Sequence, residues 1–169
     1  MQRQLAELVR QNQFAQYERL RARAGELKDE LQLVFRVNAD LENVEQMLEA
    51  TGLGARDRLG EAIDRLREGV NLLWTASRNV WGDREHRKDY VESSLRVATA
   101  SPTLRLSNQS KMEWIDLKKT AFSAGVVVHA RIELELQILS EEIAFLEPVI
   151  LGRPRDFPFS EAKSTLAFE

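Results

Sequence analysis

Five aliphatic residues recur every seven positions in the first fifty residues, and this repeat constrains the fold more than any other feature. The series is Leu20, Leu27, Val34, Leu41 and Leu48. Seven residues make about two turns of an α-helix, so these side chains form one stripe, as in a coiled coil or helical hairpin. No proline occurs before position 102, so nothing obliges this helix to break. We therefore predict one helix over residues 2–50, with the stripe as a partner-binding seam.

Two glycines follow this repeat. Gly52 and Gly54 stand where a helix C-terminus is expected, because glycine readily adopts the backbone conformation that ends a helix. Beyond them, apolar residues again alternate at spacings of four and three, from Leu59 to Val80. The pattern predicts a second helix over residues 55–81, and the short turn predicts that it folds back antiparallel on the first.

The second half of the chain predicts a short helix over residues 90–100 and a long one over residues 111–147. Ser110 and Glu113 match a capping box, in which each side chain satisfies a backbone N–H at a helix start. Pro148 is expected to end the long helix, because proline lacks a backbone N–H.

One part of the long helix has an alternative. Residues 126–136 are rich in β-branched side chains and partly alternate in polarity, as an exposed strand would. No comparable second strand exists to pair with it, so helix is favoured. The whole pattern predicts an all-α fold, an elongated antiparallel helical bundle with coiled-coil character over residues 1–151. A flexible C-terminal tail, residues 152–169, is expected to follow.

The charge of the chain argues against some classes of function. The chain has 24 basic and 27 acidic residues and a net charge of -3, which argues against a general nucleic-acid or membrane-surface binder. Residues 1–25 and 51–119 are net basic, whereas 26–50 and 120–169 are net acidic. Such blocks suit antiparallel helices or partner chains whose charges pair.

Cysteine content and hydrophobicity bear on the location of the protein. The chain has no cysteine, which is compatible with a reducing compartment. No apolar run approaches the ~20 residues that a membrane-spanning helix needs. The N-terminal residues are polar and lack an apolar core, so we expect no signal peptide and a cytoplasmic location.

Residues suited to catalysis or metal binding are few. The two histidines, His86 and His129, are far apart in sequence. Asp83 precedes His86 by three residues, a spacing that suits metal ligands, but neighbouring cations oppose a metal ion there. His129 follows three valines and is interpreted as a buried structural histidine. We expect no enzymatic activity, no metal, no cofactor and no small-molecule substrate.

A mixed basic and aromatic segment between residues 74 and 90 supports an alternative function. Its cations are Arg78, Arg84, Arg87 and Lys88, interspersed with Trp74, Trp81 and Tyr90. Cations and stacking rings together can hold single-stranded nucleic acid. The competing interpretation places the aromatic rings in the core and the charges on a solvated loop, and acidic neighbours cancel much of the charge. Nucleic-acid binding through these four cations therefore remains the alternative.

Helix–helix contact is the primary prediction. The tail carries four large apolar residues that could dock on a partner: Phe157, Phe159, Leu166 and Phe168. Segments of this kind often become ordered only on binding. We therefore expect a non-enzymatic helical interaction protein, such as an adaptor, a chaperone-like protein or a structural subunit. It would bind a protein partner, or a second copy as a homodimer, through the seam and the tail.

Overall fold

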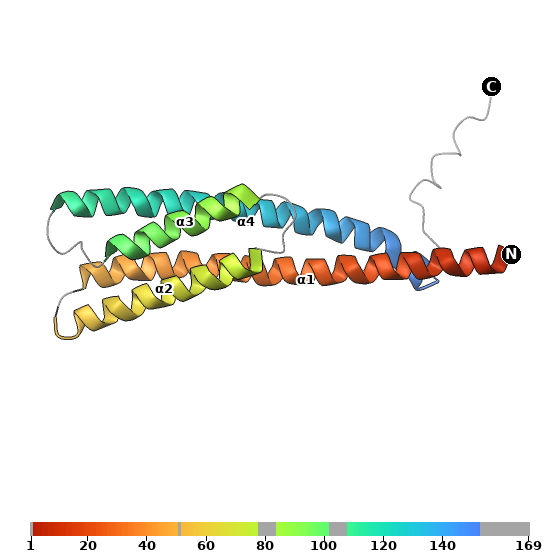
Figure 1. Cartoon of the computed structure of the whole chain (residues 1–169), viewed down its shortest axis with the longest axis horizontal. Helices are drawn as coiled ribbons and strands as arrows, with labels where there is room; N and C mark the ends of the chain where they lie inside the picture. Colours follow the sequence, from red (N-terminus) through yellow and green to blue (C-terminus); the bar gives the residue numbers. More distant parts are fainter. Residues whose placement is uncertain (1, 51, 78–83, 102–107, 153–169) are drawn as a thin grey trace, which may run out of the picture. The chain divides into compact units, whose positions relative to one another are not determined.

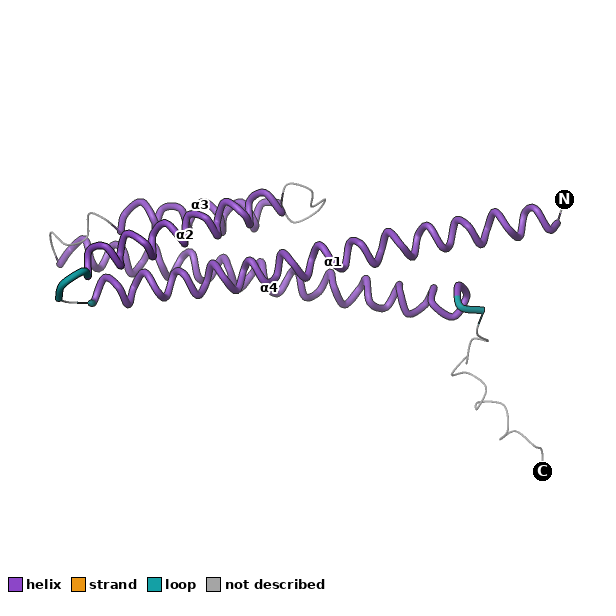
Figure 2. Tube along the Cα trace, turned by 90° about the horizontal axis from the view of Figure 1, so that it is seen from below, coloured by secondary structure: helices purple, strands orange, loops and turns teal. Residues whose placement is uncertain are grey.

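The computed structural model describes residues 2–50, 52–77, 84–101 and 108–152. These residues form four α-helices: α1 (Gln2–Glu49), α2 (Ala55–Ser77), α3 (Arg84–Ala100) and α4 (Asn108–Ile150). Figures 1 and 2 show these helices and no strand within the described ranges. The prediction of an all-α fold is confirmed, and residues 126–136 are helical, so the strand alternative for them is wrong.

The turn between α1 and α2 follows the predicted glycine signal. Gly52 and Gly54 have φ angles of +102° and +77°, a conformation that residues with a Cβ rarely adopt. The N–H of Arg58 donates to the Gly54 carbonyl at 3.0 Å, which starts α2. The predicted end of this helix, residues 78–81, lies outside the described residues.

The later helices are longer than predicted. Helix α3 begins at Arg84 instead of residue 90, and α4 begins at Asn108, so Ser110 lies inside the helix and is not its cap. Helix α4 also continues past Pro148 to Ile150. Proline so close to the end of the helix removes only one N–H donor. The helical hydrogen bonding continues beyond it, because the Leu151 N–H donates to the Glu147 carbonyl at 2.9 Å.

The chain separates into two compact units. One comprises residues 24–137, here called the bundle unit, and the other comprises residues 1–23 with 138–169, here called the terminal unit. Helices α1 and α4 each contribute a segment to both units.

In the bundle unit, α1 contacts the other three helices. Arg36 of α1 pairs with Glu68 of α2, Asn38 accepts a hydrogen bond from Tyr90 of α3, and Phe35 packs on His129 of α4. Residues toward the end of α1 meet the beginning of α4, because Glu49 pairs with Lys111. Helices α1 and α2 are likewise antiparallel, as predicted (Figure 1).

The seam of α1 is core. Leu27, Val34 and Leu41 are completely buried, and side chains of the chain's own helices surround them. They cannot face a partner, so their assignment as partner-binding residues was wrong. The apolar faces of the other helices turn inward toward α1 and supply the surface that the seam needs. Leu48 is half-buried at the end of the same stripe.

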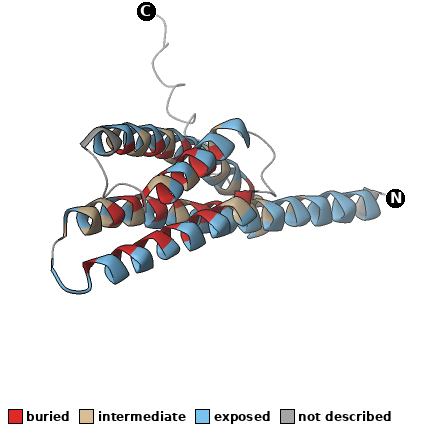
Figure 3. Cartoon of the chain, turned by 60° about the vertical axis from the view of Figure 1, so that its left-hand side comes forward, coloured by how far each residue is buried: buried red, intermediate tan, exposed pale blue. Residues whose placement is uncertain are grey.

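The terminal unit is built differently. Residues 138–150 of α4 lie antiparallel to the first part of α1, since Gln13 and Gln16 share one groove with Ile138 and Phe145 while Phe14 shares another with Ile150. Leu146 is its only buried residue among those described. Figure 3 shows the N-terminal part of α1 almost entirely in the colour of exposed residues. Leu20 is half-buried there.

Candidate functional site

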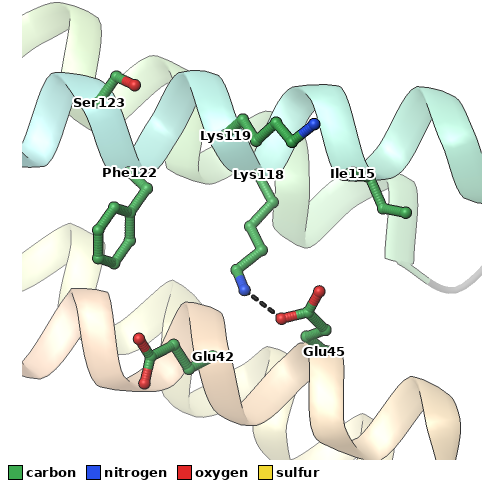
Figure 4. A pocket seen from close by; sticks show the side chains of 7 residues that line it. All are labelled: Glu42, Glu45, Ile115, Lys118, Lys119, Phe122 and Ser123. Atoms are coloured by element: carbon green, nitrogen blue, oxygen red, sulfur yellow. Dashed lines mark hydrogen bonds and ion pairs between the residues drawn. The ribbon is translucent and has the colours of Figure 1, made fainter.

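The candidate site is a groove of about 340 Å³ between α1 and α4 of the bundle unit (Figure 4). Its lining residues come from two helices: Glu42, Glu45, Ile115, Lys118, Lys119, Phe122 and Ser123. In Figure 4, Phe122 and Lys118 point from α4 toward α1, and Glu42 and Glu45 point back from α1. This combination of apolar and charged groups is open to solvent on one side of the helix pair.

Helix α3 covers the other side of that pair. The ring of Tyr90 lies so close to α4 that a Cβ built on Gly125 would approach its Cε2 to 2.8 Å. The Tyr90 hydroxyl reaches α1, where it donates to Asn38 Oδ1 at 2.7 Å. Burial raises the pKa of Tyr90 far above its ordinary value. Side chains on this side are therefore fixed in the core, whereas those on the groove side are covered by none of the helices that the structure describes.

Large apolar side chains are exposed along the groove side of α4. They are Met112, Phe122 and Val126, with relative exposures of 63%, 37% and 55%. Ile115 is half-buried among them. Spacings of three, seven and four residues from Met112 to Val126 place all four on one face of the helix. Phe35 of α1 adds a further apolar group, 55% exposed.

The two walls of the groove carry opposite charges. On α1, Glu42, Glu45 and Glu49 form an acidic row. On α4, Lys111 and Lys118 lie seven residues apart on the side toward α1, whereas Lys119 lies on the other side of Ile115 and Phe122, 4.0 Å from Asp116. Lys118 Nζ pairs with Glu45, and Lys111 Nζ lies 3.4 Å from Glu49 Oε1. In the groove, Phe122 and Ile115 of α4 thus lie on either side of the Lys118–Glu45 ion pair, with acidic residues on α1 and basic residues on α4 (Figure 4).

His129 lies at the far end of this face with its side chain 27% exposed, so the prediction that it is buried was wrong. Its ring meets Phe35 edge-on, with 4.9 Å between centroids, and its Nδ1 lies 3.4 Å from Glu133 Oε2. His86 is half-buried on α3, and Asp83 lies outside the described residues. Among the residues that the structure describes, no group of three His, Asp or Glu side chains could hold a metal ion.

The predicted nucleic-acid segment is divided by the fold. Arg87 is 1% exposed and its guanidinium pairs with Glu30, so its assignment as a cation available to nucleic acid was wrong. Arg84 and Lys88 are exposed, and Lys88 pairs with Glu92 at 3.6 Å. Arg78 and the neighbouring Trp81 lie outside the described residues. The structure therefore does not bring the four cations together on one surface.

The predicted tail contacts also fall outside the described residues. This applies to Phe157, Phe159, Leu166 and Phe168. The groove itself was not predicted. Helix α4 has two apolar stripes, and the one that contains Ala121 and Val128 is buried in the core. A second stripe at heptad spacing, from Met112 through Ile115 and Phe122 to Val126, was the signal that could have located it.

Comparisons with known proteins gave no information on function. No protein-family model, curated protein or solved structure matches the chain. No described helix is both long enough and apolar enough to cross a membrane.

Proposed function

We propose that this chain is a non-enzymatic helical interaction protein that binds a helix of a protein partner in the α1–α4 groove. The observation that carries this proposal is the apolar surface in the groove, formed by exposed Phe122 and half-buried Ile115, beside side chains of opposite charge on the two helices. Amphipathic helices bind in grooves of this kind by inserting apolar side chains at helical spacing. The acidic and basic walls would fix the direction in which the helix lies.

The terminal unit supports the same class of function. Leu5 and Val9 on α1, and Ile138 and Phe145 on α4, are about half exposed or more. Leu5, Val9 and Gln16 share a helix face by their spacing, and Gln16 lines the groove that contains Ile138 and Phe145. Helices with so few buried contacts are marginal alone and gain stability when a partner covers them. An adaptor, chaperone-like or structural role in the cytoplasm, with coiled-coil contacts to other chains, would suit these surfaces.

Substitution of the apolar surface in the groove tests this proposal. Phe122→Asp places a charge on this surface, and Leu72→Asp is the matched control because Leu72 is 43% exposed on α2 and does not line the groove. We expect tagged wild-type protein and the control to capture the same protein from cells of origin, and Phe122→Asp to lose it. The captured protein, once purified, should bind the variant at least about ten-fold more weakly by calorimetry, as expected for an interface anchor.

One control on folding makes the result interpretable. Helical content by circular dichroism must be the same in all three proteins, since Phe122 is partly exposed and its loss should not unfold the bundle. Equal binding of the purified partner to Phe122→Asp and wild type would contradict the proposal.

A further inference from the structure

We infer that the partner in the α1–α4 groove is the same groove of a second copy of this chain. The two copies would be related by a two-fold axis parallel to α1 and α4. This inference rests on the proposed function, because it names the occupant of the same surface. The charges that line the groove point to a second copy as the occupant.

Each wall of the groove is complementary to the opposite wall of a second copy. The α1 wall is acidic at Glu42 and Glu45, and the α4 wall is basic at Lys118 and Lys119. A two-fold axis that runs along the groove places α1 of one copy over α4 of the other. Because Glu45 already pairs with Lys118 within each copy, Glu42 and Lys119 are the groove charges that meet across the axis. They do so in both directions at once, as a self-complementary two-fold interface requires. An unrelated partner would need a basic group opposite Glu42 and an acidic group opposite Lys119, on the correct sides of one helix pair.

The positions of the charges along the helix axes also fit this arrangement, because oppositely charged residues of the two copies lie at the same height. Rotation about an axis parallel to the helices leaves the position of each residue along that axis unchanged. Within one copy, Glu45 is level with Lys118 and Glu49 with Lys111, because these residues form ion pairs. Glu42 and Lys119 line the same groove. Glu42 of one copy is therefore placed near Lys119 of the other without any shift along the helices.

The apolar surface of the groove lies where the axis passes. Phe122 and Ile115 would meet their equivalents across the axis, and Met112 and Val126 would extend this contact along α4. These side chains are exposed or half-buried in one copy. The α1 and α4 segments of two copies would form an antiparallel four-helix arrangement, a packing that buries apolar stripes of this width. The ion pair of Lys118 with Glu45 would then border a buried contact.

Mass measurements on the full chain test the inference first. We expect light scattering to show the 19.4 kDa chain at low micromolar concentration and twice that mass as concentration rises. Glu42→Lys and Lys119→Glu should each weaken self-association by about ten-fold at low ionic strength, because each variant places like charges opposite each other twice in the dimer. Arg67→Glu on α2, 47% exposed in its side chain and outside the groove, is the control and should dimerise as wild type does.

Mixing the two charge-reversed variants is the decisive experiment. A pair of Glu42→Lys and Lys119→Glu chains has opposite charges at both cross-contacts, so native mass spectrometry should show mixed dimers at concentrations where neither variant dimerises alone. A charge effect within one chain could not produce this rescue. A chain that stays monomeric to about millimolar concentration, where weak dimers still form, would overturn the inference. So would charge variants that dimerise as wild type does, or a mixture that associates no better than its components.

The failure of this inference can be separated from failure of the proposed function. A monomeric wild-type chain that still captures a different protein, with loss of that protein in Phe122→Asp, would overturn the second-copy assignment and support the groove as a binding site. Dimers that form equally well with Phe122→Asp would show a different interface and overturn the inference.

Discussion

The guanidinium of Arg87 and the carboxylate of Glu30 form an ion pair in the core of the bundle unit. Arg87 Nε lies 2.6 Å from Glu30 Oε1, and the two side chains are 1% and 2% exposed. Ser77 Oγ donates to the same Oε1 at 2.9 Å, and Glu135 Oε1 lies 3.7 Å from Arg87 Nη1. The cluster thus joins residues from all four helices and fixes the position of α3 on the bundle.

We predict that removing either partner of this pair destabilises the bundle strongly. Arg87→Met or Glu30→Leu leaves a charge in the core without its partner, which costs about 3–5 kcal/mol. The double variant should lose much less than the sum of the two, because no unpaired charge remains. Urea denaturation followed by circular dichroism measures all three. Additive losses in the double variant would show that the pair does not interact as the distances imply.

The position of Arg87 shows what the sequence could not predict. A dense run of charges around residues 84–89 normally indicates a solvated surface, and the partner that brings Arg87 into the core, Glu30, lies 57 positions away in the sequence. By contrast, the helices and the core position of Leu27 follow from local spacing. The groove depends on which face of α4 is left uncovered, and packing of α3 decides that. Periodicity alone identifies both faces of α4 without saying which one is buried.

Gly125 should tolerate no larger residue, whereas Gly60 should. A Cβ on Gly125 would lie 2.8 Å from Asn38 Oδ1 and from Tyr90 Cε2, but a Cβ on Gly60 meets nothing within 4 Å. Gly125→Ala is therefore expected to lose about 1–3 kcal/mol through overpacking. Gly60→Ala should gain up to about 1 kcal/mol, because alanine favours a helix over glycine. Thermal and urea unfolding measure the stability of the two variants. A gain in stability for both would mean that Tyr90 and Asn38 do not pack closely against Gly125.

Asp40 should make the stability of the bundle depend on pH. Its side chain is 14% exposed and its Oδ2 has no hydrogen-bond partner within the described part of the chain, although Arg36 Nε lies 3.9 Å away. Burial raises the pKa of Asp40 above the ordinary value of 3.8, while Arg36 and Arg65 act in the opposite direction and Glu68 raises it further. Since the folded state holds the proton more tightly than the unfolded state, the ionised carboxylate destabilises the fold above the folded-state pKa.

Asp40→Asn should therefore raise the melting temperature at about pH 7, because the amide stays neutral. The gain should shrink as the pH falls through the folded-state pKa and vanish below 3.8, where Asp40 is protonated in both states. Asp64→Asn is the control, since the Asp64 side chain is 77% exposed. A lower melting temperature for Asp40→Asn at neutral pH would show that the attraction of Arg36 outweighs burial.

The terminal unit should open more readily than the bundle unit. Its one buried residue among those described is Leu146, whereas residues 27–44 of α1 contain five completely buried aliphatic side chains. Local opening is easiest where few apolar contacts must break. Hydrogen-exchange mass spectrometry at low protein concentration should therefore show faster amide exchange in residues 4–23 and 138–150 than in residues 27–44.

A variant separates this local effect from global unfolding. Leu146→Ala removes the main apolar contact of the terminal unit, so exchange should accelerate further in residues 4–23 and 138–150. Exchange in residues 27–44 should not change, because their buried contacts lie within the bundle unit. Acceleration of both regions together would mean that the chain unfolds as one cooperative unit. Equal protection of the two regions in the wild-type protein would likewise contradict the prediction. It would show that the terminal unit is as stable as the bundle unit despite its smaller number of buried residues.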